Sequence, residues 1–111
     1  MAKVEIIESL KNEVLKKFKG ESVTIFELMR SLAESPHKGK IVGVAGGIII
    51  KELKYQGFRF YFILEGDRLK IFSKELLIDL LIKFVRMSNK KDQQKIIEEI
   101  KHVLRVMGGE F

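Results

Sequence analysis

Two segments rich in β-forming residues, IIIKELKY at positions 48–55 and FRFYFIL at positions 58–64, are separated only by a Gln-Gly pair. Branched and aromatic residues on either side of two turn-forming residues are typical of a β-hairpin. With a two-residue loop, Lys54 on the first strand lies directly opposite Arg59 on the second. The sequence therefore predicts a central hairpin whose register follows from the length of its loop.

Side chains alternate between the two faces of a sheet, so the residues of each hairpin face can be assigned. One face is mostly apolar and is predicted to be core; it carries Lys51, Leu53, Tyr55, Phe58, Phe60 and Phe62. The other face carries Ile50, Glu52, Lys54, Arg59, Tyr61 and Ile63. Like charges directly opposite each other destabilise a strand pair, so Lys54 and Arg59 could be kept there to bind an anion such as phosphate. The alternative is a polar face turned to water, which antiparallel sheets commonly have.

Length and composition indicate one globular domain spanning residues 1–111, with 46% hydrophobic and 32% charged residues. The net charge of +6 fits an anionic partner, either nucleic acid or an acidic protein segment, or else a lysine-rich surface that only aids solubility.

The absence of cysteine excludes disulfides, thiolate metal sites and cysteine nucleophiles. It fits a reducing compartment, and no segment is apolar enough to cross a bilayer, so we expect a cytoplasmic protein without a membrane partner.

Helices are predicted before and after the hairpin. Apolar residues recur every three or four positions over residues 8–18 and again over residues 90–107. Thr24 begins a capping-box pattern, so a further helix is predicted to start there and to end before Pro36. Residues 3–7 could form either a short edge strand or the first turn of a helix.

Further strands are predicted around the hairpin at residues 41–44 and 69–72. Residues 76–86 are apolar at almost every position, which does not separate a buried strand from a buried helix, and strand is favoured for residues 80–85. The predicted order is (β)-α-α-β-β-β-α. This order indicates an α+β domain with its helices on one face of a small antiparallel sheet.

A second group of cations precedes the last predicted helix. Arg86 ends the apolar segment, and Lys90 and Lys91 begin the helix. Cations at a helix N-terminus oppose the helix dipole, whereas an anion there would be bound by free N–H groups and by the lysines. The segment is therefore either an anion site or a charged cap turned to water.

The two histidines, His37 and His102, have no ligand partner at suitable spacing, so we expect no metal site.

Three short motifs carry a resemblance to a known family: Ser-Leu-Ala-Glu-Ser-Pro at 31–36, Lys-Glu-Leu-Lys at 51–54 and Gly-Phe-Arg-Phe-Tyr-Phe at 57–62. Followed by a basic segment and a last helix, they resemble the RelE/ParE superfamily of small bacterial and archaeal toxins over roughly residues 4–104. The resemblance implies an N-terminal helical hairpin packed on a small antiparallel sheet, with a C-terminal helix. RelE-type members cleave messenger RNA on the ribosome, ParE-type members inhibit gyrase, and both are silenced by a peptide antitoxin.

The resemblance implies a metal-free endoribonuclease mechanism in which the RNA 2′-hydroxyl attacks the adjacent phosphate. The products would be a cyclic phosphate and a free 5′-hydroxyl. Arg59 and Arg86 would stabilise the transition-state charge, and Lys54 would orient the phosphate or transfer a proton. Glu52 is the nearby candidate for a carboxylate base. The residues expected to contact the nucleic acid are Glu52, Tyr61, Lys90 and Lys91.

The function implied is the toxin of a type II toxin–antitoxin pair, which cleaves messenger RNA on the ribosome without a cofactor and binds a peptide antitoxin. Two departures from the family set alternatives beside it. No tyrosine follows Tyr61, although RelE has a later tyrosine that helps the reaction, and the stretch between Gly66 and Arg86 is longer than the family's final strand. The alternatives are a non-catalytic or gyrase-directed ParE-like interaction module and a basic nucleic-acid-binding domain.

Overall fold

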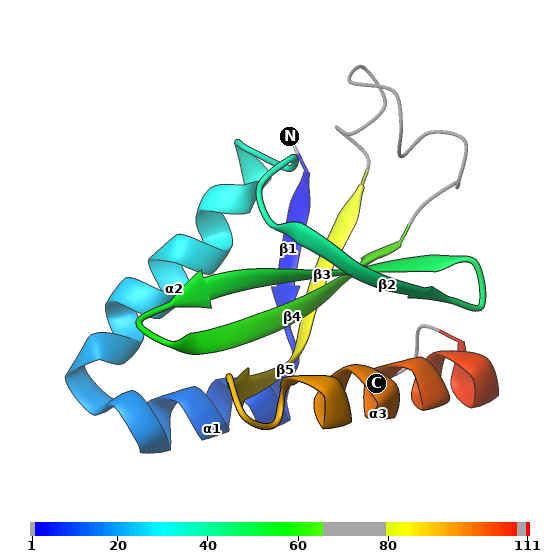
Figure 1. Ribbon diagram of the computed structural model, residues 1–111. Coiled ribbons are helices and arrows are strands. Elements are labelled where there is room, and N and C mark those ends of the chain that lie inside the picture. Colours follow the sequence, from blue (N-terminus) through cyan, green and yellow to red (C-terminus); the bar gives the residue numbers. More distant parts are fainter. Residues whose placement is uncertain (1, 66–79, 109–110) are drawn as a thin grey trace.

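The computed structural model describes residues 2–65, 80–108 and 111 of the chain (Figure 1). These residues form five strands and three α-helices around one sheet, so the predicted α+β class is confirmed. The bounds of the elements in chain order are β1 Lys3–Ile6, α1 Glu8–Phe18, α2 Ser22–Arg30, β2 Lys40–Ala45, β3 Ile48–Tyr55, β4 Phe58–Glu65, β5 Leu81–Asn89 and α3 Gln93–Met107.

The strands follow the order β1-β5-β4-β3-β2 across the sheet. β1 pairs with β5 in parallel, with Lys3 opposite Leu81 and Ile6 opposite Phe84, while all other pairs are antiparallel. The sheet is therefore mixed, and the prediction of an antiparallel sheet was wrong. The loose alternation of residues 3–7 did not indicate a partner for this strand, and the partner lies near the other end of the chain.

The central hairpin has the predicted register, with Lys54 opposite Arg59 in β3 and β4. Both loop residues have positive φ, 46° at Gln56 and 86° at Gly57. This is the requirement of a type I′ turn, whose twist matches that of the two flanking strands. The loop therefore sets the pairing of all the residues that follow on β4.

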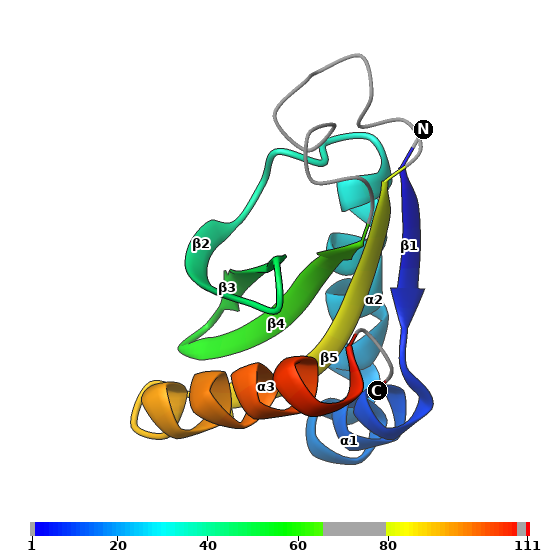
Figure 2. The same ribbon diagram turned by 90° about the vertical axis from the view of Figure 1, so that its right-hand side faces the viewer.

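Helices cover both faces of the sheet, so the prediction of helices on one face was also wrong. Figure 2 shows α2 behind the sheet and α3 in front of it. The core under α1 and α2 includes Leu10, Val14, Ile25, Met29, Phe60, Phe62 and Phe84. The core under α3 includes Ile50, Tyr61, Ile63, Val85, Ile97, Ile100 and Leu104. Both faces carry large apolar side chains, so both must be shielded from water.

The two N-terminal helices differ in part from prediction. α1 has the predicted bounds, whereas α2 begins at Ser22 rather than at Thr24 and has no side-chain cap hydrogen bond. The predicted capping box is therefore wrong, and the Ser22 hydroxyl instead donates to the Val14 carbonyl at 3.1 Å. A strand precedes these helices, and they diverge from the turn that joins them (Figure 1), so the helical hairpin implied by the resemblance is not matched in full.

The strand favoured at residues 80–85 is present and continues to Asn89 as β5. The side-chain oxygen of Asn89 accepts a hydrogen bond from the Asp92 N–H at 2.8 Å, which shapes the turn before α3. The helix therefore starts three residues later than predicted, and Lys90 and Lys91 lie in the turn rather than in the first helical turn. The predicted strand at residues 69–72 lies outside the described residues.

Gly39, in the loop before β2, is expected to resist substitution. Its φ is 96°, and a Cβ there would lie 2.8 Å from Cζ of Phe62 and 3.0 Å from the Glu52 carbonyl oxygen. Gly39→Ala should therefore lower the free energy of unfolding by about 2 kcal/mol, measured by urea denaturation. Gly20→Ala is the matched control, because a Cβ there meets nothing within 4 Å. Equal losses in the two variants would contradict the role assigned to the Gly39 backbone.

Candidate functional site

Lys54 and Arg59 lie opposite each other on adjacent strands, and Ser88 of β5 lies opposite Arg59 on its other side. The two basic side chains therefore share one face of the sheet, as the hairpin pattern predicts. Their environments differ, because Lys54 is exposed whereas Arg59 is only 7% exposed. Only one of the two cations is therefore open to an approaching anion.

The predicted polar face is covered by α3 over most of its length. Glu52 is 2% exposed and Tyr61 is fully buried. The Gln93 side chain, at the start of α3, donates a hydrogen bond to Oε2 of Glu52 at 3.1 Å. The expectation that Glu52, Arg59 and Tyr61 form an open face is therefore wrong. The physical reason is that Ile50 and Ile63 lie on the same face and pack against the apolar stripe of α3.

The buried Arg59 guanidinium is turned toward the protein. Its Nε lies 4.0 Å from Oε2 of Glu52, and its Nη1 donates to the Gly57 carbonyl at 3.1 Å. Within the described part of the chain, Nε itself has no hydrogen-bond partner. A buried charge is stable only when it is paired, so Glu52 and Arg59 depend on each other beneath the first turn of α3.

Tyr61 completes this buried group through a 2.8 Å hydrogen bond between its phenol and the Ser88 hydroxyl. Burial raises the pKa of Tyr61 above its ordinary value; Glu52 acts in the same direction, while the Ser88 hydrogen bond and Arg59 oppose it. The phenol is therefore protonated at neutral pH. Because its ring is fully enclosed, it cannot stack on a nucleic-acid base as the sequence suggested.

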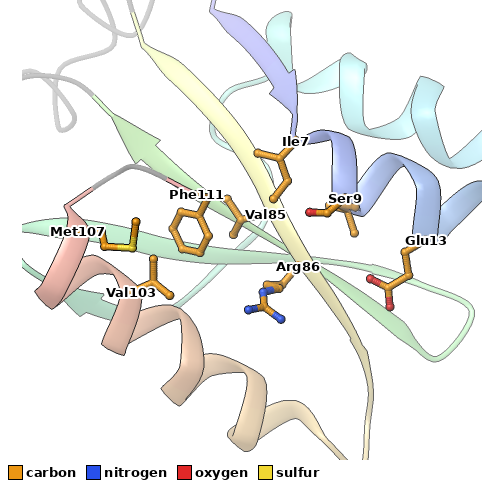
Figure 3. A pocket seen from close by; sticks show the side chains of 9 residues that line it. Ile7, Ser9, Glu13, Val85, Arg86, Val103, Met107 and Phe111 are labelled. Atoms are coloured by element: carbon orange, nitrogen blue, oxygen red, sulfur yellow. The ribbon is translucent and has the colours of Figure 1, made fainter.

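Arg86 is a diagonal neighbour of Arg59 in the strand register, but its side chain has different partners. It pairs across from Tyr61 beside a β-bulge, and its Nη1 lies 3.8 Å from Oε2 of Glu99 on α3. Figure 3 shows its side chain extending from β5 toward α3, into a cavity of about 440 Å³ that Glu13 of α1 also lines. The structure therefore brings Lys54 and Arg59 together on one face, but it does not gather Lys54, Arg59 and Arg86 around one open site.

A different set of cations lies at one end of the sheet and is distributed over both of its faces. The hairpin turn and the turn before α3 are neighbours there, because Phe58 at the start of β4 pairs with Asn89 at the end of β5. The Nζ of Lys17, near the end of α1, lies 5.1 Å from the centre of the Phe58 ring. We call this group the basic end; it consists of the exposed residues Lys17, Lys54, Lys90 and Lys91.

Lys17 was missed by the sequence prediction, which placed the cationic sites on the hairpin face and in the segment from Arg86 to Lys91. A signal was present in the KKFK run at positions 16–19, where the apolar period of α1 ends in consecutive cations. Acidic side chains also occur near the basic end, since Glu21 accepts a hydrogen bond from the Tyr55 phenol at 3.4 Å and Asp92 follows Lys91. Each of the four lysines is nevertheless exposed, so each is accessible to a solvent-borne anion.

Comparisons with known proteins give no relative for this chain: no family model, curated protein or solved structure matches it. Among the described residues, no group of three or more His, Asp or Glu side chains is placed to hold a metal ion. None of the described helices is long and apolar enough to cross a membrane.

Proposed function

We propose that this chain is the toxin of a type II toxin–antitoxin pair, RelE-like in fold, and that it binds messenger RNA on the ribosome through the basic end. The supporting observation is that Lys17, Lys54, Lys90 and Lys91, from three separate segments of the chain, all lie at the same end of the sheet: Lys17 on the face of Phe58, Lys54 on the face of Arg59, and Lys90 and Lys91 in the turn that follows β5. Lysine ammonium groups bind phosphate oxygens, and neighbouring cations can contact successive phosphates of one strand. A peptide antitoxin is proposed as the partner that silences the protein.

The RelE-like part of the proposal has two supports. The hairpin register carries Lys54 and Arg59 on adjacent strands, as in the motifs that resemble the family. The order of elements agrees with that resemblance in part: two helices precede the central hairpin and a helix follows the last strand, whereas the sheet is mixed and has helices on both faces.

Cleavage makes a stronger demand on the site than RNA binding does. Attack by a 2′-hydroxyl needs cations in contact with the scissile phosphate as charge develops on it. Lys54 is open to such contact, whereas Arg59 is paired inward with Glu52 and Arg86 lies near Glu99. For Arg59 to take part, the start of α3 would have to move away from the sheet when RNA binds.

The burial of Glu52 and Arg59 favours a second candidate, a non-catalytic interaction module of the same fold. In this alternative the protein binds RNA at the basic end and blocks translation without cutting the transcript. The Glu52–Arg59 pair would then serve only to hold α3 on the sheet.

Controlled expression in bacterial cells tests the proposal. We expect the wild-type chain to arrest growth, with protein synthesis stopping before DNA synthesis. Lys54→Gln should relieve the arrest at least in part, because Lys54 is exposed and is proposed to contact RNA rather than the core. Lys3→Gln is the control, because Lys3 is also an exposed lysine but lies on β1. This variant should leave the arrest unchanged. Pulse labelling of protein and DNA provides the measurement.

Mapping of transcript ends in the arrested cells separates the candidates. New 5′-hydroxyl ends within translated messages would support the nuclease, and arrest with intact messages would support the non-catalytic module. DNA synthesis stopping first would support a gyrase-directed protein instead, and no arrest in the absence of any antitoxin would overturn the toxin assignment.

A further inference from the structure

We propose that a small cavity beside the basic end receives one base of the bound RNA and prefers guanine. The inference rests on the proposed RNA binding and adds to it a site and a specificity. The cavity has a volume of about 240 Å³ and is bounded by α1, the end of β5 and the start of α3. Its lining residues are Glu13, Lys17, Phe58, Met87, Ser88, Asn89, Asp92 and Ile96.

The cavity exists because β5 is longer than its parallel neighbour. β1 ends at Ile6, opposite Phe84, and the chain then turns away into α1. Beyond that point, among the described strands, β5 pairs with β4 alone. The last residues of β5 therefore form the floor of a hollow whose walls are α1 and α3, and Lys17 of the basic end lines it.

The size and walls of the cavity suit a single base. Its volume lies below the range of roughly 300–1,000 Å³ that is usual for sites of larger ligands. Phe58, Met87 and Ile96 supply an apolar and aromatic wall, which binds the face of a base. The Phe58 ring is held by an edge-on contact with Phe18, with ring centres 5.0 Å apart, so this wall is fixed in place.

Lys17 connects the cavity to the phosphate-binding surface. It lines the cavity, and its ammonium lies over the Phe58 ring that forms part of the same wall. Lys90 and Lys91 lie in the turn between Asn89 and Asp92, two other lining residues. A nucleotide whose base entered the cavity would therefore have cations close to its phosphates.

The polar groups of the lining favour guanine over the other bases. Glu13 and Asp92 provide carboxylate groups, which accept hydrogen bonds and do not donate them. The oxygen of the Asn89 amide is already engaged by the Asp92 N–H, which leaves its NH₂ as a donor. Guanine is the base that presents two adjacent donors, N1–H and the 2-amino group, to a single carboxylate, and bidentate contacts of this kind discriminate bases strongly.

Fluorescence anisotropy with labelled RNA hexamers tests this inference. We expect the wild-type protein to bind an oligoadenylate hexamer with one central guanosine about tenfold more tightly than the all-adenosine hexamer. A hexamer with inosine at that position, which lacks the 2-amino group, should have an intermediate affinity. Asp92→Asn or Glu13→Gln should reduce the ratio between the affinities for the guanosine-containing and the all-adenosine hexamers.

Glu27→Gln is the matched control, since Glu27 is exposed on α2 and does not line the cavity. This variant should keep the full preference for guanosine.

A second readout uses the wild-type protein alone. The NMR signal of the Met87 methyl group should shift on addition of guanosine monophosphate and not on addition of adenosine monophosphate.

Two failures can be told apart. Equal binding of all three hexamers, or no selective shift of Met87, would overturn the guanine site and leave RNA binding standing. An absence of binding to every hexamer would overturn the proposed function itself.

Discussion

Glu52→Leu is expected to lower the free energy of unfolding by about 3–5 kcal/mol, because it leaves the Arg59 guanidinium buried without its counter-charge. Arg59 is only 7% exposed, and its Nε lies 4.0 Å from the Glu52 carboxylate. The same change removes the acceptor of the Gln93 side chain, so the start of α3 also loses a hydrogen bond to the sheet. Urea denaturation followed by circular dichroism provides the measurement.

Two further variants isolate the charge effect. Glu52→Leu combined with Arg59→Met should recover much of the lost stability, because the remaining side chains are both apolar and no charge stays buried. Glu99→Gln is the control, since Arg86 and Glu99 form an ion pair whose side chains are each 42% exposed, and breaking such a pair costs less than about 1 kcal/mol. If Glu52→Leu cost no more than Glu99→Gln, Arg59 would not depend on Glu52.

This dependence affects how the role of Arg59 can be tested. Replacing Arg59 alone would leave Glu52 buried and unpaired, so the variant would lose stability and activity together. Lys54 is the better probe of the proposed function, because it shares the face and the strand pairing of Arg59 but is exposed. A loss of activity on changing Lys54 can be attributed to the surface.

The combined variant of Lys54, Lys90 and Lys91, each changed to Gln, is expected to bind single-stranded RNA about a hundredfold more weakly at 0.1 M salt. Three cation–phosphate contacts would be lost, and fewer counterions would be released when the RNA binds. Lys17 is left intact because its packing on Phe58 links it to the core. Fluorescence anisotropy with a labelled RNA of unbiased sequence gives the dissociation constants.

A second triple variant controls for the loss of net charge. Lys3, Lys38 and Arg105 are exposed at other parts of the surface, on β1, before β2 and near the end of α3. Changing these three to Gln removes the same charge and should weaken binding much less. Equal weakening by the two triple variants would mean that RNA responds to the overall charge of the protein and not to the basic end.

The hairpin could be predicted in detail because its information is local. The two-residue loop sets the register, and the alternation of side chains then places Lys54 and Arg59 on the same face. The bounds of α1 were likewise predictable from a clear apolar period that ends near Gly20. In each case the residues that determine the structure are close together in the sequence.

The accessibility of the site could not be predicted in the same way. The hairpin face with Glu52 and Arg59 also carries Ile50 and Ile63. This face is buried because α3, which lies much later in the sequence, packs on it. The strong apolar stripe of that helix was recognised, but nothing local indicated which face it covers. One signal for the buried pair was available, since Glu52 and Arg59 are diagonal neighbours in the predicted register and carry opposite charges.

The location of the basic end and its cavity also depends on long-range pairing. The parallel contact between β1 and β5 ends at Ile6, and this allows α1 to leave the sheet beside the last residues of β5. Lys17 comes close to Phe58 only as a result of that path. The sequence contained the cations, and the tertiary structure determines which of them are neighbours.

The most direct test of RNA binding at the basic end is the salt dependence of RNA affinity in the wild-type protein and in the Lys54, Lys90 and Lys91 triple variant. A plot of the logarithm of the binding constant against the logarithm of salt concentration should be linear for both proteins. The slope should be less steep by about 2 in the variant, because three contacts to single-stranded phosphate are missing. Identical slopes in the two proteins would contradict the assignment of this surface to RNA.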